Sequence, residues 1–302
     1  MEFPFRYDHT QPLSFGGVMP HMRSFDESAV VILPIPVDRT TSYVGGTRNG
    51  PHEILLASSH MELWDEEVRA DVHGVGIFTL PEMELPFGEM AAVVDEIERV
   101  AYEIIGRDKF LIALGGEHSI TPPLVSAAAR KYAQLSVVQI DAHADMRDAY
   151  LGSPLSHACA MRRSLEYAKV TQVGIRSLST EEAEVLPQLG TKVFFDWDMR
   201  RNPQWIDAVV DTLGEHVYVT IDVDGMDPAI MPATGTPEPG GLSWQEITAL
   251  LRAVTERRRV VAADVVELSP IPGVIAPNFL TAKLIYKLLT YRFAGDNRAK
   301  RL

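Results

Sequence analysis

Three side chains able to bind a metal alternate at the end of one apolar run. Residues 139–148 read QIDAHADMRD and place Asp141, His143 and Asp145 at every second position. In an extended chain alternate side chains point to the same face, so these three should face one way. Two carboxylates and an imidazole that close would repel or titrate upward unless a cation neutralised them. A metal site is therefore the first interpretation.

Similar side chains follow other apolar runs. FLIALGGEHS brings Glu117 and His118 after two glycines that permit a sharp turn, VYVTIDVDGMDP contains Asp222 and Asp224, and VVAADVVELSP contains Glu267 before a Ser-Pro turn. Alone, each has a structural explanation as a turn residue or a helix cap. Their joint occurrence at several predicted strand ends favours a metal site.

The predicted donor set decides the kind of metal. Four aspartates and two histidines are too many for one tetrahedral zinc and too rich in oxygen for a soft-metal site. Two divalent ions sharing bridging carboxylates fit better, with Mn²⁺ expected and Co²⁺, Ni²⁺, Fe²⁺ or Zn²⁺ left open. Such a pair, about 3.5–4 Å apart, would deprotonate a bridging water near neutral pH.

The elements that must position these residues are short apolar strands alternating with helices. Residues 88–108 carry an amphipathic helical pattern, SWQE at 243–246 is a capping box opening a helix to about Arg258, and Ser179 with Glu182 repeats that spacing. The alternation predicts an α/β fold with a mostly parallel sheet covered on both faces, where ligands bind beyond the carboxyl ends of the strands. Strands are expected at 29–36, 110–116, 135–143, 170–175, 191–196, 217–224 and 260–268.

Length and composition limit the remaining choices. No linker or internal repeat interrupts the chain, so one domain over residues 1–302 is expected. A net charge of −13, with only a short NRAKR tail as a basic run, disfavours a nucleic-acid or anionic-membrane partner. It suits a cationic substrate or metal ions, although ordinary surface acidity is the alternative.

Cysteine usage and hydropathy bear on the compartment. The single cysteine, Cys159, excludes an intramolecular disulfide and fits a reducing compartment. The first ten residues, MEFPFRYDHT, do not read as a secretion signal, and no apolar run reaches membrane-spanning length. A cytoplasmic protein without a membrane partner is expected.

Three of these motifs together resemble a known family. GGEHS, DAHAD and TIDVDGMDP occur in the order of the three metal signatures of the ureohydrolases, which include arginase and agmatinase. The likeness runs from GGTRNGP near residue 45 to VVELSP near 268. It implies a three-layer α/β/α, arginase-like fold and a homo-oligomer, trimeric or hexameric. It also implies two Mn²⁺ per chain, one held by His118, Asp141, Asp145 and Asp222 and the other by Asp141, His143, Asp222 and Asp224, with Asp141 and Asp222 bridging.

The resemblance also implies a reaction. A metal-bridging hydroxide would attack the guanidino carbon, while Glu267 accepts the guanidinium in a charge-assisted pair. Asp145 would hydrogen-bond the hydroxide and pass its proton to the departing amine. His157, in SPLSHACAMRR, matches the histidine assigned to proton transfer or substrate contact.

The segment from Pro232 to Glu246, PATGTPEPGGLSWQE, looks like that of agmatinases, whereas MRDAYLGSPLSHA lacks the polar loop with which arginases hold an amino acid. The expected reaction is therefore hydrolysis of agmatine, a small cationic guanidino substrate, to urea and putrescine. Alternatives are guanidinobutyrate, guanidinopropionate or arginine hydrolysis, or a formimidoyl-amino-acid hydrolase. Two features depart from the family pattern: Asn49 replaces a usual aromatic, and Ala158-Cys159 follows His157 where glycine is common.

Two rival interpretations come from other classes. Cys159 and His157 stand two residues apart and would form a nucleophilic hydrolase if they shared a face, although nothing else supports an activated thiol. The second is a non-enzymatic protein that has the ureohydrolase fold and binds its partner through the metal. The presence of every ligand position together with Glu267 and His157 speaks against that.

Overall fold

The computed structural model describes residues 13–17 and 24–301. Within these residues, the centre of the molecule is an eight-stranded sheet in the order β3-β1-β4-β9-β8-β5-β6-β7, and every neighbouring pair is parallel. A separate antiparallel pair joins β2 to β10. The strands are β1 (Val30–Ile35), β2 (Ala70–Asp71), β3 (Ile77–Thr79), β4 (Phe110–Gly115), β5 (Ser136–Ile140), β6 (Lys169–Ile175), β7 (Lys192–Phe195), β8 (His216–Asp222), β9 (Arg259–Val266) and β10 (Lys300–Arg301).

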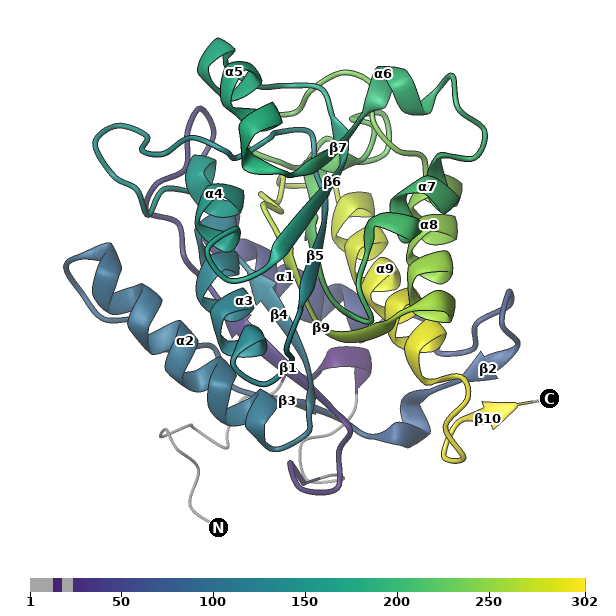
Figure 1. The fold of residues 1–302 in the computed structure, drawn as a ribbon. Helices are drawn as coiled ribbons and strands as arrows, with labels where there is room; N and C mark the ends of the chain where they lie inside the picture. The colour runs from purple at the N-terminus through teal and green to yellow at the C-terminus, as the bar shows by residue number, and fades with distance from the viewer. Residues whose placement is uncertain (1–12, 18–23, 302) are drawn as a thin grey trace.

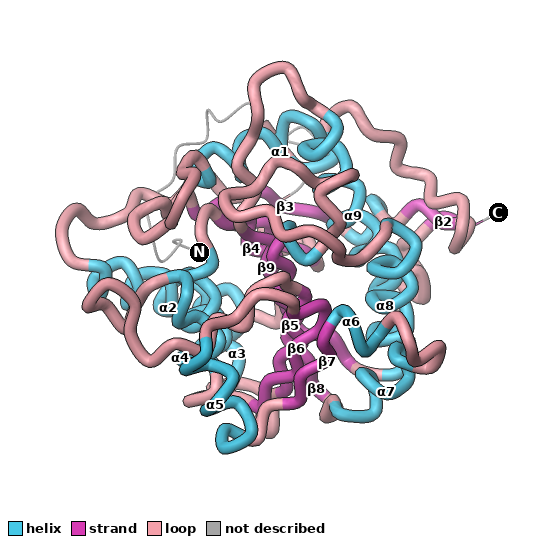
Figure 2. The backbone as a smooth tube through the Cα atoms, turned by 90° about the horizontal axis from the view of Figure 1, so that it is seen from above, coloured by secondary structure: helices cyan, strands magenta, loops and turns pink. Residues whose placement is uncertain are grey.

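Helices cover both faces of the sheet, as Figures 1 and 2 show: α2, α3 and α4 lie on one side, and α7, α8 and α9 on the other. This arrangement confirms the predicted α/β/α layers with a mostly parallel sheet. The helices are α1 (Gly50–Ser58), α2 (Met90–Gly106), α3 (Thr121–Ala129), α4 (Ala160–Ser164), α5 (Thr180–Leu189), α6 (Asp196–Met199), α7 (Trp205–Thr212), α8 (Trp244–Arg257) and α9 (Ala276–Phe293).

The sheet separates two hydrophobic cores because successive side chains of each strand point to opposite faces. In β4, Leu111 and Ala113 join the core under α2 and α3, whereas Ile112 and Leu114 join the core on the opposite face. All six residues of β4 are buried. A strand buried on both faces has no polar positions, which explains its continuous apolar sequence.

The predicted elements are found close to their expected bounds. Each of the seven apolar runs contains a sheet strand, and the amphipathic pattern at 88–108 forms α2. Both capping boxes are present: Ser179 and Ser243 each accept the backbone N–H three residues on, from Glu182 and Glu246. The short edge strand β3 and the β2–β10 pair are not predicted, because strands of two or three residues carry too few positions for a periodic pattern.

The strand order brings distant segments together. β4, β9, β8 and β5 are adjacent in the sheet, and parallel strands bring their carboxyl ends to one edge. In Figure 1 this edge lies toward the top, on the side of α5 and α6. The four segments that follow these strands are those singled out above for their ligand-type residues.

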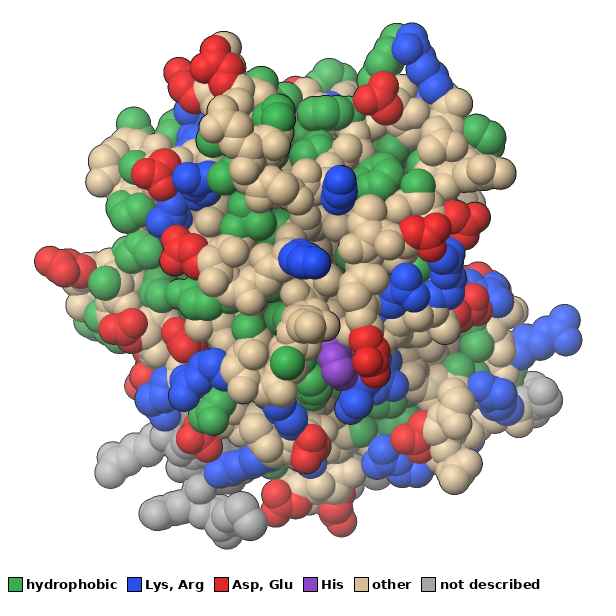
Figure 3. Space-filling model, in the orientation of Figure 1, with side chains coloured by type: hydrophobic (Ala, Val, Ile, Leu, Met, Phe, Trp, Pro, Cys, Tyr) green, Lys and Arg blue, Asp and Glu red, His purple; other side chains and the backbone are tan. Residues whose placement is uncertain are grey.

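The surface and the hydropathy of the helices bear on partners. On the face seen in Figure 3, acidic and basic side chains are interspersed. In the part of the chain that the structure describes, no helix has the length and apolarity needed to cross a membrane. The N-terminal segment considered for a secretion signal lies outside the described residues.

Candidate metal centre and active site

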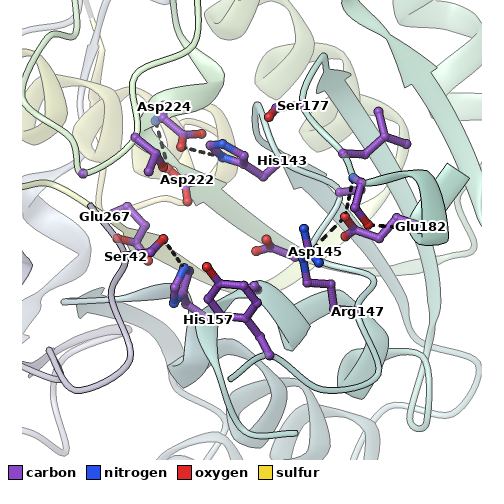
Figure 4. A pocket seen from close by; sticks show the side chains of 17 residues that line it. Ser42, His143, Asp145, Arg147, His157, Ser177, Glu182, Asp222, Asp224 and Glu267 are labelled. Atoms are coloured by element: carbon purple, nitrogen blue, oxygen red, sulfur yellow. Dashed lines mark hydrogen bonds and ion pairs between the residues drawn. The ribbon is translucent and has the colours of Figure 1, made fainter. Parts of the chain in front are cut away.

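The predicted site residues converge at the carboxyl edge of the sheet. His118 lies in the 3-10 helix after β4, Asp141 directly follows β5, Asp222 ends β8, and Glu267 directly follows β9. A cavity at this edge is lined by six of the predicted residues, and His118 and Asp141 lie against its acidic members. The six are shown in Figure 4: His143, Asp145, His157, Asp222, Asp224 and Glu267.

The reason for this convergence differs from the predicted one. β5 ends at Ile140, so strand alternation does not extend to His143 and Asp145, and Asp224 lies in a 3-10 helix beyond β8. The backbone of Asp145 adopts a left-handed conformation with φ 53°, which is uncommon outside glycine. Loop geometry, rather than the strand pleat, turns these side chains inward.

Hydrogen bonds fix the turn after β5. The carbonyl of Asp145 accepts the backbone N–H groups of Met161 and Arg162 at 3.1 and 3.0 Å. The Asp141 carboxylate accepts the backbone N–H of His143 at 2.5 Å and the amide of Gln139 at 2.6 Å. The loop is thus held to α4 at one end and to its own strand at the other.

Two groups of ligand-type atoms share one aspartate. In the first, Nδ1 of His118 lies 3.2 Å from an Asp141 oxygen and 3.0 Å from an Asp145 oxygen. In the second, Nδ1 of His143 lies 2.9 Å from an Asp224 oxygen and 3.7 Å from the other oxygen of Asp141. Asp141 therefore faces both groups with different oxygens, as a bridging ligand would.

Asp222 stands slightly apart. It is a member of neither group, although one of its carboxylate oxygens lies 3.5 Å from Nδ1 of His118. Its other oxygen accepts the backbone N–H of Asp224 at 2.9 Å. Its predicted bridging role remains a prediction.

The electrostatics of the cluster favour bound positive charge, either protons or cations. Burial and the neighbouring charges of Asp224 and Asp141 raise the pKa of Asp222 well above its usual range. Burial and the charge of Asp141 likewise raise the pKa of Asp145. Burial opposes the charged form of His143, yet the negative charge of Asp224 raises its pKa to about 12. Protons bound by these groups are what metal ions would displace.

The donor geometry of His118 fits a metal as well. Its Nε2 lies 2.9 Å from the hydroxyl of Thr220, which itself donates to Asp264 at 2.6 Å. Because that hydroxyl proton points to Asp264, Nε2–H is the donor to Thr220, and Nδ1 is the nitrogen that faces the carboxylates. Burial opposes the charged form of His118, but the carboxylates of Asp141 and Asp145 raise its pKa, so a metal binding at Nδ1 would displace a proton. Nδ1 is buried without a hydrogen-bond partner among three carboxylates. A divalent cation would satisfy this arrangement.

Glu267 and His157 lie on the wall of the same cavity. Glu267 is 8% exposed, has φ 65°, and accepts the backbone N–H of His118 at 2.7 Å through one oxygen. Burial and the charge of Glu117 raise its pKa well above the usual range, so a cationic partner would stabilise its ionised form. His157 begins a 3-10 helix and lies beside the Tyr150 ring, with the centroids 6.0 Å apart.

The positions that depart from the family pattern have different surroundings. Ala158 lines the cavity, whereas Asn49 is exposed at the start of α1 and is not among the lining residues. Cys159 is buried, and its thiol approaches the carbonyl of Ser153 at 3.8 Å. Burial raises the pKa of this thiol to about 11, which argues against the predicted rival of a cysteine nucleophile.

Sequence reasoning missed several residues of the site. Asp264 precedes Glu267 by three positions but reads as part of an apolar strand. Glu182 is predicted only as half of a capping box, yet it also accepts the backbone N–H of Met146 beside the cavity at 2.8 Å. Arg147 and Ser42 carry no motif that would have marked them as cavity-lining residues.

A parallel α/β sheet with an acidic, histidine-containing cluster at its carboxyl edge is typical of α/β enzymes, which bind their ligands at this edge. The model of the arginase family matches residues 28–290, and the chain belongs to this family. It is 40% identical to an N(1)-aminopropylagmatine ureohydrolase of Synechocystis sp., covering 92% of this chain and 93% of that protein. It is 36% identical to an agmatinase of Bacillus cereus, covering 82% and 86%.

A solved structure supports the same assignment. The agmatine ureohydrolase of Thermoplasma volcanium superimposes with a TM-score of 0.81 at 32% identity, covering 89% of this chain and 92% of that one. The chain is thus a hydrolase of the agmatinase or ureohydrolase type with an arginase-like fold.

Proposed function

We propose that this protein hydrolyses the guanidino group of agmatine to urea and putrescine with the help of two Mn²⁺ ions. One observation carries the proposal: two ligand groups share Asp141, and Glu267 lies on the wall of the same cavity. A pair of cations beside a buried carboxylate suits a substrate that is both a cation and a target for hydrolysis.

The metal ligands follow the two groups. His118, Asp141 and Asp145 would hold one ion, and Asp141, His143 and Asp224 the other, with Asp222 contributing to both. When bound there, the ions supply an activated water nucleophile near neutral pH. Carboxylate-rich ligation with some imidazole supports Mn²⁺ among the divalent metals.

The remaining residues bind the substrate and move protons. One oxygen of Glu267 is engaged by the His118 backbone, so its other oxygen is the one proposed to accept a guanidinium N–H. Asp145, beside His118 and on the cavity wall, is proposed to carry a proton to the departing amine. His157, which lines the same cavity, is proposed to contact the substrate or relay that proton.

The proposed specificity rests on the end of the substrate away from the guanidinium. Arginine presents a carboxylate that must be desolvated, whereas agmatine does not. Arg147 is the one lysine or arginine side chain among the described cavity-lining residues, so it alone of these types could pair with a substrate carboxylate. Its guanidinium already lies 3.8 Å from the Glu182 carboxylate and over the Tyr150 ring. An unpaired buried charge costs several kcal/mol, so a preference for agmatine on the order of a hundredfold or more is expected.

A second candidate substrate is N(1)-aminopropylagmatine. The Synechocystis relative named for this activity is 40% identical to the chain, against 36% for the agmatinase of Bacillus cereus. Both compounds carry the same guanidinium, so the metal ligands and Glu267 act alike on either. Comparing kcat/KM for the two compounds, at equal metal loading, decides between them.

The chain is further proposed to act as one domain within a cytoplasmic homo-oligomer, trimeric or hexameric. Family membership supports the assembly, and the single cysteine fits a reducing compartment. Light scattering of the purified protein measures the assembly, and a monomeric mass would refute that part of the proposal.

A further inference from the structure

A second buried carboxylate lies close to the cavity but outside the ligand groups. Glu117 has no exposed surface. One of its oxygens accepts the backbone N–H groups of Arg39 and Thr40, both at 2.6 Å. The other accepts the hydroxyls of Thr40 and Ser119, also both at 2.6 Å. Two donors on each oxygen are the full complement of an ionised carboxylate, which only accepts.

Thr40 joins this carboxylate to His157. The Thr40 hydroxyl oxygen lies 3.3 Å from Nδ1 of His157 and accepts the His157 backbone N–H at 2.9 Å. Because the hydroxyl proton is directed at Glu117, the oxygen has only lone pairs left for the imidazole. A proton on Nδ1 of His157 makes this contact a hydrogen bond, and the hydroxyl of Ser156, 3.5 Å from Nδ1, can accept from the same N–H.

The other ring nitrogen then has a defined role. With the proton on Nδ1, neutral His157 keeps its lone pair on Nε2. Nε2 lies 3.3 Å from the hydroxyl of Ser42, which lines the cavity together with His157 (Figure 4). The nitrogen on the substrate side is therefore an acceptor of hydrogen bonds and protons.

We propose that Thr40 and Glu117 are positioning residues that hold His157 in its Nδ1–H tautomer, with Nε2 presented to the substrate as an acceptor. The proposal rests on the proposed function only for the part that His157 plays in turnover. The tautomer itself is inferred from the hydrogen bonds that run from Glu117 through Thr40 to His157.

Three substitutions test the chain through kinetics. Thr40→Val removes the hydroxyl at constant size and should lower kcat by about 10–100-fold with KM changed less than about threefold, since a misoriented acid–base group costs that order. Thr40→Ser keeps the hydroxyl and should recover most of the loss. The matched control is Ser119→Ala, which removes a donor from the same Glu117 oxygen at the same distance but leaves the chain to His157 intact.

Glu117→Gln gives a sharper prediction. The introduced side-chain amide would point its oxygen at the two backbone N–H groups and its NH₂ at Thr40, so the Thr40 hydroxyl would have to donate to Nδ1 of His157. The tautomer would then reverse, and kcat should fall at least as far as in Thr40→Val. Unchanged thermal melting and metal content show that a variant is folded and loaded.

A spectroscopic readout separates this proposal from the proposed function. Solid-state NMR of ¹⁵N-histidine-labelled protein, loaded with diamagnetic Mg²⁺ or Zn²⁺, distinguishes protonated from unprotonated ring nitrogens. The His157 signal is assigned by its loss in His157→Asn. We expect a protonated Nδ1 in the native protein and a protonated Nε2 in Glu117→Gln.

The outcomes are distinguishable. A native His157 protonated on Nε2 overturns the proposal, whatever substrate the enzyme takes. The proposal is also overturned if Thr40→Ser loses as much kcat as Thr40→Val, or if Ser119→Ala does. Either result would indicate that kcat depends on packing of the loop and not on the Thr40 hydroxyl. Absence of urea release from every guanidino compound would refute the proposed function while leaving the tautomer measurement valid.

Discussion

Nε2 of His118 lies 2.9 Å from the hydroxyl of Thr220, and this contact aims the other ring nitrogen at three carboxylates. The Thr220 hydroxyl in turn donates to the Asp264 carboxylate. That carboxylate also accepts hydrogen bonds from the hydroxyls of Tyr218 at 2.6 Å and Thr121 at 3.0 Å. All of these side chains are buried. The orientation of His118 is thus set from behind by a carboxylate that does not face the cavity.

Asp264→Asn should therefore weaken metal binding without removing a ligand. Outer partners of a ligating histidine typically contribute 10–100-fold to metal affinity, and a loss of about that size is expected in the Mn²⁺ dissociation constant measured by calorimetry. Thr290→Val is a suitable control, since Thr290 is equally buried but donates only to the Tyr286 carbonyl in α9. Equal Mn²⁺ affinities for the native protein and Asp264→Asn would contradict the role of Asp264 in orienting His118 through Thr220.

Substitutions of shared and unshared ligands should differ in metal stoichiometry. Asp141→Ala removes oxygens that face both groups and should reduce binding of both ions, whereas His143→Ala should mainly empty one. Metal analysis after Mn²⁺ loading and gel filtration gives the number of ions per chain. Two ions in the native protein are expected, and a saturated value of one would rule out the binuclear site.

Glu267→Gln should separate substrate binding from metal binding. The substitution preserves size and the contact with the His118 backbone but removes the charge proposed to pair with the guanidinium. We expect kcat/KM for agmatine to fall by at least about a hundredfold, since a buried charge-assisted pair contributes several kcal/mol. Metal content should stay native, and a loss of bound metal would instead identify Glu267 as a structural part of the metal centre.

The thiol of Cys159 should be inert at neutral pH. Because its pKa is raised to about 11, only about one thiol in a thousand is ionised at pH 8, and only the thiolate reacts. Iodoacetamide at pH 7.5 should leave urea release unchanged over a time that fully alkylates free cysteine. Rapid inactivation matched by modification of Cys159 would revive the cysteine-nucleophile interpretation.

Much of this molecule is predictable from sequence because its signals are local. A strand buried on both faces must be continuously apolar, and Ser243 with Glu246 signals a helix start by two reciprocal hydrogen bonds. The candidate metal ligands are recognisable because several carboxylates beside imidazole are costly at strand ends. Such patterns need no knowledge of the tertiary structure.

Other features depend on contacts between distant segments. The inward turn of Asp145 uses a left-handed backbone held by α4, although the alternating spacing is typical of a strand. Asp264 appears in sequence as a polar interruption of an apolar strand, and its role requires Thr220 and His118 on neighbouring elements. Thr40 reaches Glu117 across 77 positions, which no periodic pattern encodes.

Urea release by the Mn²⁺-loaded protein, measured as kcat/KM on agmatine, N(1)-aminopropylagmatine, arginine and guanidinobutyrate, tests the proposed function most directly. Agmatine should yield urea and putrescine in equal amounts, with arginine slower by about a hundredfold or more. A preference for guanidinobutyrate would instead assign Arg147 as the partner of a substrate carboxylate. Metal-loaded protein that releases no urea from any of the four compounds would contradict guanidino hydrolysis itself.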